Sequence, residues 1–138
     1  MASGMYNRFK ANLMNKEVDL EADVIKVMLL NDSHSFTATH NQKSEIVANE
    51  ITGTGYTAGG VALAGKAVTQ GASTKWDADD AEWAGATFSA WNAVIYDDDL
   101  TNDDLIASID FGGEKPVSGG TFKIVWHVNG IVTLATAA

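Results

Sequence analysis

Acidic side chains gather in two short stretches of the chain, and carboxylate oxygens are ligands that Ca²⁺ prefers. The stretches contain Asp77, Asp79, Asp80 and Glu82, and then Asp97, Asp98, Asp99, Asp103 and Asp104. A calcium loop of the EF-hand type starting at Asp97 would need glycine where Asn102 stands and glutamate where Ser108 stands. We therefore expect solvated turns and assign no metal ligands, and Ca²⁺ binding by these turns stays an open alternative.

Two glycine-rich segments imitate nucleotide-binding loops. Segment 60–67 nearly matches a P-loop, but Ala67 replaces the hydroxyl residue that binds Mg²⁺, and the interior is apolar like a strand. Segment 53–58 imitates a dinucleotide fingerprint, yet glycine and strand-like residues follow it instead of a helix that could hold a pyrophosphate. We expect neither segment to bind a nucleotide, and the sequence implies no cofactor.

The residue types of nucleophilic catalysis do not occur at a useful spacing. The chain has no cysteine, its histidines are scattered at His34, His40 and His127, and it has no Gly-x-Ser-x-Gly motif. Consecutive acids on a turn also lack the separate environments that give a glycosidase its acid and its base. We therefore expect a protein that is not an enzyme.

Tryptophan offers a different kind of site, because a flat aromatic ring can stack on a sugar. Trp91 and Trp126 fall within alternating apolar segments, where we expect them to fill the core. Trp76 and Trp83 flank acidic residues and could either pack in the core or stack on a carbohydrate. A carbohydrate-binding module is thus an alternative function, and it predicts that Trp76 or Trp83 is exposed.

Composition and charge limit the partners further. A chain of 138 residues with 46% hydrophobic content suits one compact domain. Residues 1–16 hold three basic side chains and no acidic one, which gives +3. Residues 17–138 therefore carry −12, and the net charge of the chain is −9. An acidic body repels phosphate backbones, so no nucleic acid partner is expected. Without a secretory signal or an apolar run of membrane-spanning length, we expect no membrane association and synthesis in the cytoplasm.

The basic N-terminal arm has the pattern of a short amphipathic helix. Met5, Phe9 and Leu13 recur at a spacing of four, Tyr6 falls on the same side, and Arg8 falls on another. A helix this short is only marginally stable alone in water. Its apolar stripe must therefore pack on its own chain or on a neighbouring subunit. Both alternatives stay open, and Tyr6, Arg8, Phe9 and Leu13 are candidate contact residues.

Several segments have the length and residue types of β-strands. They are 24–30, 61–69, 88–96, 105–111 and 121–128, with a helical turn or ordered loop expected in 37–51. In segment 88–96, alternation places Phe88, Val94 and Tyr96 on one face and Trp91, Ala93 and Ile95 on the other. Both faces are therefore apolar, and both need cover from a helix, a loop or a partner.

Asn129-Gly130 follows segment 121–128 directly and is typical of a two-residue hairpin turn. The pattern predicts that residues 131–135 return antiparallel beside 121–128. In that register, Val125, Val132 and Leu134 share the face opposite Trp126. We predict that these three residues form a contact patch in a self-complementary dimer.

Together these patterns predict a mainly β protein. We expect an antiparallel β-sandwich (jelly roll) over residues 18–138, preceded by a short N-terminal helix or arm over residues 1–17.

Six segments carry a resemblance to a known family. They are YNRF at 6–9, DVIKVMLL at 23–30, YTAGG at 56–60, DDAEWAGATF at 79–88, IDFG at 109–112 and GTFKIVW at 120–126. In these segments, and in their order, the chain resembles the capsid cement (decoration) proteins of tailed phages from about Tyr6 to Leu134. It departs from them at Trp91, where that family leads us to expect a polar residue.

The resemblance implies a jelly-roll fold and homodimers on the capsid exterior of a virion assembled in a bacterial host. It further implies that the protein reinforces contacts between major capsid protein subunits. No residue-level site carries over, and a tail or fibre location stays open.

Overall fold

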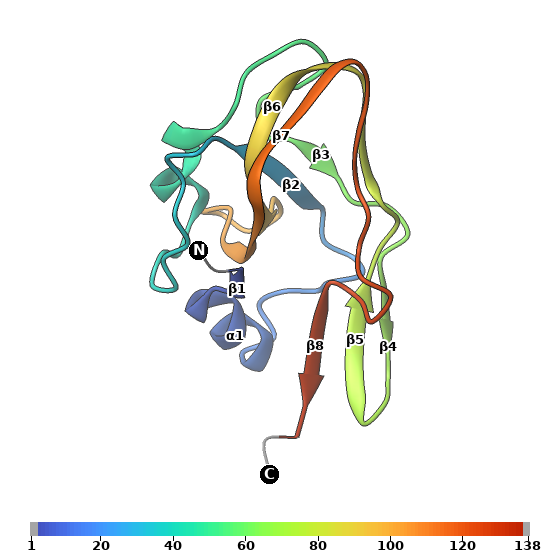
Figure 1. Ribbon diagram of the computed structural model, residues 1–138. Coiled ribbons are helices and arrows are strands. Elements are labelled where there is room, and N and C mark those ends of the chain that lie inside the picture. The colour runs from blue at the N-terminus through green and yellow to red at the C-terminus, as the bar shows by residue number, and fades with distance from the viewer. Residues whose placement is uncertain (1–2, 137–138) are drawn as a thin grey trace.

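A computed structural model describes residues 3–136, and over that range the protein is mainly β structure with two antiparallel sheets and a short helix (Figure 1). The elements are β1 (Gly4–Met5), α1 (Asn7–Met14), β2 (Ile25–Leu30), η1 (Lys43–Glu45), η2 (Val47–Asn49), β3 (Val61–Ala62), β4 (Ala67–Thr69), β5 (Ser73–Asp77), β6 (Ala81–Asp97), β7 (Leu105–Ile124) and β8 (Val132–Ala135). One sheet has the order β1-β7-β6-β2-β3 and the other β4-β5-β8. The predicted β-sandwich with a short N-terminal helix is confirmed.

β6 and β7 are inner strands of the larger sheet. Together they form a long ribbon that arches over the top of the molecule in Figure 1. β6 has 17 residues and β7 has 20, and they pair from Ala81 with Ile124 to Tyr96 with Leu105. The sequence pattern treats 105–111 and 121–128 as separate strands. That separation is wrong, because the ladder to β6 continues across the glycines between them.

Strand β2 lies beside β6 and is buried on both faces. Ile25, Val27 and Leu29 contribute to the main core between the sheets, whereas Met28 and Leu30 contribute to a second, smaller core on the opposite face. The second core is covered by Tyr6 and by the loop before β3, through Phe36 and Ile46. The chain itself thus supplies the cover that strands with two apolar faces require.

A β-bulge corrects the predicted faces of β6. The register with β7 shifts between Ala90 and Asn92, which reverses the alternation of side chains at that point. Phe88 therefore lies in the main core with Ala93 and Ile95, not on the face of Val94 and Tyr96. Trp91 sits at the irregularity and is only half-buried.

The predicted hairpin of residues 121–128 and 131–135 is wrong. Gly130 does adopt a positive φ of 98° and turns the chain. After the turn, however, β8 pairs with β5, and the N–H of Ile131 donates to the carbonyl oxygen of Trp76 at 2.8 Å. A dipeptide specifies a turn but not which strand lies beyond it, and here the edge of β5 is the partner.

The N-terminal arm packs against the β-sandwich. β1 pairs with β7, and α1 forms where the spacing predicts a helix. Tyr6 and Phe9 are 0% and 1% exposed, so the apolar stripe closes the core of its own chain. No helix of residues 3–136 is long and apolar enough to cross a membrane.

Candidate docking surface

Exposed apolar side chains concentrate around the smaller sheet. Met14, Val68, Val125, Val128 and Leu134 are all large and exposed, with Leu134 at 62% and Val68 at 45%. They come from α1, β4, β8 and the connection 125–131, which precedes β8. In Figure 1, α1, β4, β5 and β8 lie together at the lower end, which we call the small-sheet end. An apolar surface at one end of an acidic protein suits contact with another protein.

A groove of about 390 Å³ crosses the small-sheet end between α1 and β8. In the antiparallel pair of β5 and β8, Val132 lies opposite Trp76 and Leu134 lies opposite Thr74, so these side chains share one face. The apolar side chains that line the groove are Leu13, Val18, Leu20, Val68, Trp76, Val132 and Leu134. We call it the α1–β8 groove.

A second hollow, of about 720 Å³, follows the last part of β7, and we call it the β7 cleft. It lies where the predicted hairpin would have placed a strand beside β7. Its apolar lining includes Met5, Ile109, Phe111, Ile124, Val125, Trp126 and Ile131. The charged side chains in the lining are Lys115 and Lys123, and no carboxylate lines it. Lys123 also pairs with Asp80 and Glu82, each at 3.5 Å, so part of the positive charge at this cleft is already balanced.

The structure divides the residues predicted to make contacts. Leu13, Val132 and Leu134 lie together in the α1–β8 groove. Val125 is 70% exposed but lines the β7 cleft instead, so the predicted patch of Val125, Val132 and Leu134 is wrong. The patch depended on the hairpin register, which the chain does not adopt.

The other predicted contact residues lie on the N-terminal arm. Arg8 is exposed on α1. Tyr6 and Phe9 are enclosed by their own chain and are not accessible to a partner in this conformation. The apolar stripe of the N-terminal helix thus packs on its own chain, which is one of the two alternatives that the sequence leaves open.

Trp76 and Trp83 are too buried to form a sugar-stacking platform. Trp76 is 2% exposed and donates its indole N–H to the carbonyl oxygen of Leu20 at 2.9 Å. Trp83 is 5% exposed and packs in an aromatic cluster, 6.4 Å from Tyr56 and 5.8 Å from Phe122 between ring centroids. The exposure that a carbohydrate-binding module requires at one of these two positions is therefore absent.

Trp91 and Trp126 also differ from expectation. Trp91 lines a polar hollow with His34 instead of filling the core. Trp126 is half-buried at the β7 cleft, and its indole N–H donates to the carbonyl oxygen of Asp79 at 3.0 Å. The two tryptophans flanking the acidic stretch are the core residues, and the two in the apolar segments are the more exposed ones.

One buried acid stands apart from the other carboxylates. Asp97 is 0% exposed, and burial together with the nearby carboxyl of Asp23 raises its pKa to about 8. Asp23 lies outside both acidic stretches, so no pattern in the sequence connects it with Asp97.

Among the described residues, His34 is buried with its Nε2 atom 3.0 Å from the Oγ atom of Ser108. Burial lowers the pKa of His34, nearby His40 lowers it further, and Asp110 opposes the shift. Neither His34 nor Asp97 lines the α1–β8 groove or the β7 cleft. The candidate surface is thus suited to binding through apolar contact.

Comparisons with protein-family models, with curated proteins and with solved structures find no match to this chain.

Proposed function

We propose that this protein is a structural component of a tailed-phage virion that binds the outer surface of the capsid. There it reinforces the contacts between major capsid protein subunits. The proposal rests on the sequence resemblance to cement proteins and on the apolar surface at the small-sheet end. It requires no covalent chemistry.

The α1–β8 groove is the observation that carries the proposal. Leu13, Val132 and Leu134 were predicted as contact residues from sequence patterning alone, and they line the same groove. Leu134 and Val68 are exposed there, and Met14 at the end of α1 is 89% exposed. Covering these side chains with a partner removes apolar area from water, which is the main driving force of protein association.

Strand β8 adds a second means of contact. In residues 3–136 it is an edge of its sheet, because the strand order is β4-β5-β8. An unpaired edge presents backbone N–H and C=O groups that a strand of another subunit can extend. Backbone pairing at β8 would lie directly beside the α1–β8 groove.

Modest contacts are sufficient for such a role. A standard interface buries about 800 Å² per partner. On a closed shell many symmetry-related copies act together, so the total effect exceeds the strength of any one contact.

Self-association is part of the same proposal. Val125 lines the β7 cleft, whereas Val132 and Leu134 line the α1–β8 groove. We propose dimerisation through the β7 cleft and capsid binding through the α1–β8 groove. Light scattering should give twice the monomer mass for the wild-type protein and the monomer mass for Val125→Asp. A wild-type protein that stays monomeric at high concentration would remove dimerisation from the proposal.

Adding the purified protein to expanded capsids that lack it tests the proposed function. Co-sedimentation should show saturable binding, and the decorated capsids should survive heating to a higher temperature than undecorated ones. Labelling of the protein in virions, viewed by electron microscopy, should place it on the head. Absence of binding to capsids, or label confined to the tail, would contradict the capsid role.

A further inference from the structure

Three carboxylates from distant parts of the chain meet beside the start of β2. Asp23 precedes β2, Asp97 ends β6, and Asp99 lies in the turn that follows β6. The antiparallel register, in which Ile25 lies opposite Asp97, brings these segments together. One carboxylate oxygen from each acid lies within 4.8 Å of those from the other two.

Backbone N–H groups hold each carboxylate in place. Asp97 accepts from the N–H of Asp99 at 3.0 Å, and Asp99 accepts from the N–H of Val24 at 2.8 Å. Asp23 accepts from the N–H of Asp19 at 3.1 Å. The three side chains are therefore fixed by the fold before any ligand arrives, which reduces the entropy lost on binding.

The Oδ2 atom of Asp97 is a second indication that the cluster binds a ligand. Asp97 is 0% exposed, and its Oδ2 atom is buried without a hydrogen-bond partner. A buried carboxylate oxygen without a partner is costly, and native proteins rarely leave one so. Because Asp97 belongs to the cluster, a positively charged ligand bound there would give this oxygen atom a partner.

Nearby acids in the same turn region already have partners. Asp98 pairs with Lys26 at 3.2 Å, and Asp103 pairs with Lys43 at 3.1 Å. Asp104 accepts from the side chain of Asn12 at 2.9 Å. The ion pairs found across residues 3–136 include none of the three clustered acids. Within the described part of the chain, no basic side chain therefore forms an ion pair with the cluster.

We propose that Asp23, Asp97 and Asp99 bind one Ca²⁺ ion. Oxygen ligands of Ca²⁺ lie about 2.3 to 2.6 Å from the ion, so two of them are at most about 5 Å apart. The separation of 4.8 Å or less fits that limit.

The surroundings of the cluster favour Ca²⁺ over Mg²⁺. Asp97 is buried, Asp23 is half-buried and Asp99 is exposed, so one side stays open for water ligands. Ca²⁺ accepts six to eight oxygens in irregular geometry, whereas Mg²⁺ demands a near-ideal octahedron and gives up its water reluctantly.

The ion would fasten the segment before β2 to the turn between β6 and β7. Those parts already meet through the N–H of Asp98, which donates to the carbonyl oxygen of Val24 at 2.8 Å. A bound Ca²⁺ would add a charged link at the same place and stabilise the folded chain. This role does not depend on a capsid partner, so it can be tested on the isolated protein.

Calorimetric titration of chelator-treated protein with CaCl₂ tests the site. Wild-type protein should bind one Ca²⁺ and unfold at a higher temperature with Ca²⁺ than with equal Mg²⁺. Asp97→Asn should weaken Ca²⁺ binding at least about tenfold, as expected for loss of a metal ligand. Asp98→Asn is the matched control in the same turn and should change the affinity less than about fivefold, because half-exposed charges interact weakly through water.

Asp99→Asn provides a second variant at an exposed position, where folding does not depend on the side chain being buried. It should also lose Ca²⁺ binding while keeping the circular dichroism of the wild type. The proposal is overturned if wild-type protein gives neither a heat of binding nor a thermal shift with Ca²⁺. It is equally overturned if a folded Asp97→Asn or Asp99→Asn variant binds as tightly as Asp98→Asn.

Discussion

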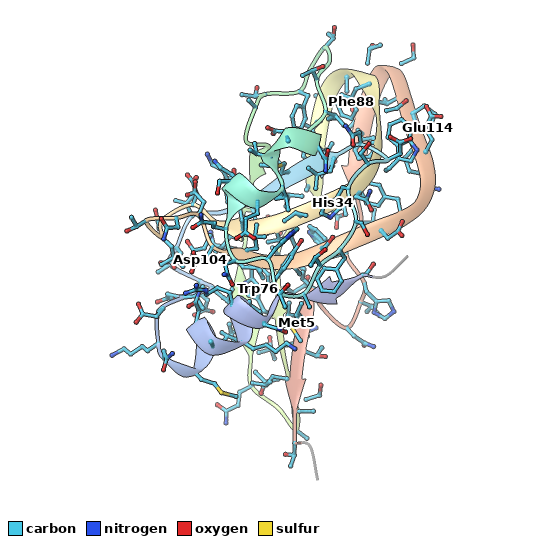
Figure 2. The ribbon with its side chains drawn as sticks, turned by 90° about the vertical axis from the view of Figure 1, so that its left-hand side faces the viewer. Met5, His34, Trp76, Phe88, Asp104 and Glu114 are labelled. Atoms are coloured by element: carbon cyan, nitrogen blue, oxygen red, sulfur yellow. The ribbon has the colours of Figure 1, made fainter. Side chains whose placement is uncertain are left out.

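Trp76 lies directly opposite Val132 in the pair of β5 and β8, and its indole N–H donates to the carbonyl oxygen of Leu20 at 2.9 Å. One side chain thus joins the C-terminal strand, the middle of the smaller sheet and the segment after α1. Trp76 is buried, and in Figure 2 Phe88 and Glu114 mark the end of the molecule away from α1. The small-sheet end depends on this residue for its shape.

Trp76→Ala should therefore destabilise the protein by about 3 to 5 kcal/mol, the usual cost of removing a large buried aromatic side chain. Trp76→Phe keeps most of the apolar contact but leaves the carbonyl oxygen of Leu20 without its donor, so we expect about 1 to 3 kcal/mol. Denaturant unfolding measures both values. Trp91→Ala, at a half-buried position outside the core, is the control and should cost less than either.

Gly130 gives a second test of how β8 reaches β5. Its φ is 98°, and an added Cβ atom would lie 2.9 Å from the carbonyl oxygen of Trp76. Gly112 has a similar φ of 79° but open space where a Cβ atom would be. Gly112→Ala should cost about 1 kcal/mol for the left-handed backbone alone, and Gly130→Ala should cost more because of the additional contact. Equal losses in unfolding free energy would contradict the close approach of this turn to β5.

Acidification should reveal the buried histidine. Burial lowers the pKa of His34 below its ordinary value of 6.5, so the unfolded chain takes up a proton at higher pH than the folded chain does. The contribution of His34 to stability is therefore lost as the pH falls below 6.5. We expect the free energy of unfolding to fall more for wild type than for His34→Gln between about pH 7.5 and pH 5.5. Parallel curves for the two proteins would show that His34 is not the group responsible.

The sequence predicts local structure better than it predicts pairing. Alternation and apolar runs locate β2, most of β6 and both ends of β7, and the spacing of Met5, Phe9 and Leu13 locates α1. These signals work because each depends on residues close together in the chain. The partner of β8 depends on which sheet edge is free in the folded chain, and Asn129-Gly130 carries no information about that.

Part of the candidate surface can be predicted from the sequence, because the apolar character of a side chain is also a local signal. The apolar character of Leu13, Val132 and Leu134 identifies them, and they line one groove. Trp76, which lies opposite Val132, holds the segment after α1 through the carbonyl oxygen of Leu20. Val125 was assigned to the same patch only through a hairpin register. The acidic cluster was missed because Asp23 is 74 positions from Asp97, and only the pairing of β2 with β6 brings the two together.

Binding of surface variants to capsids that lack the protein tests the central claim most directly. Leu134→Asp places a charge in the α1–β8 groove at a side chain 62% exposed, and Val47→Asp places the same charge on η2 at one 40% exposed. Because both side chains are exposed, both variants should fold like the wild type. We predict that Leu134→Asp weakens capsid binding at least about tenfold and Val47→Asp less than about threefold, as expected if the groove is the centre of the interface. Wild-type affinity in Leu134→Asp would contradict the assignment of the α1–β8 groove as the capsid-binding surface.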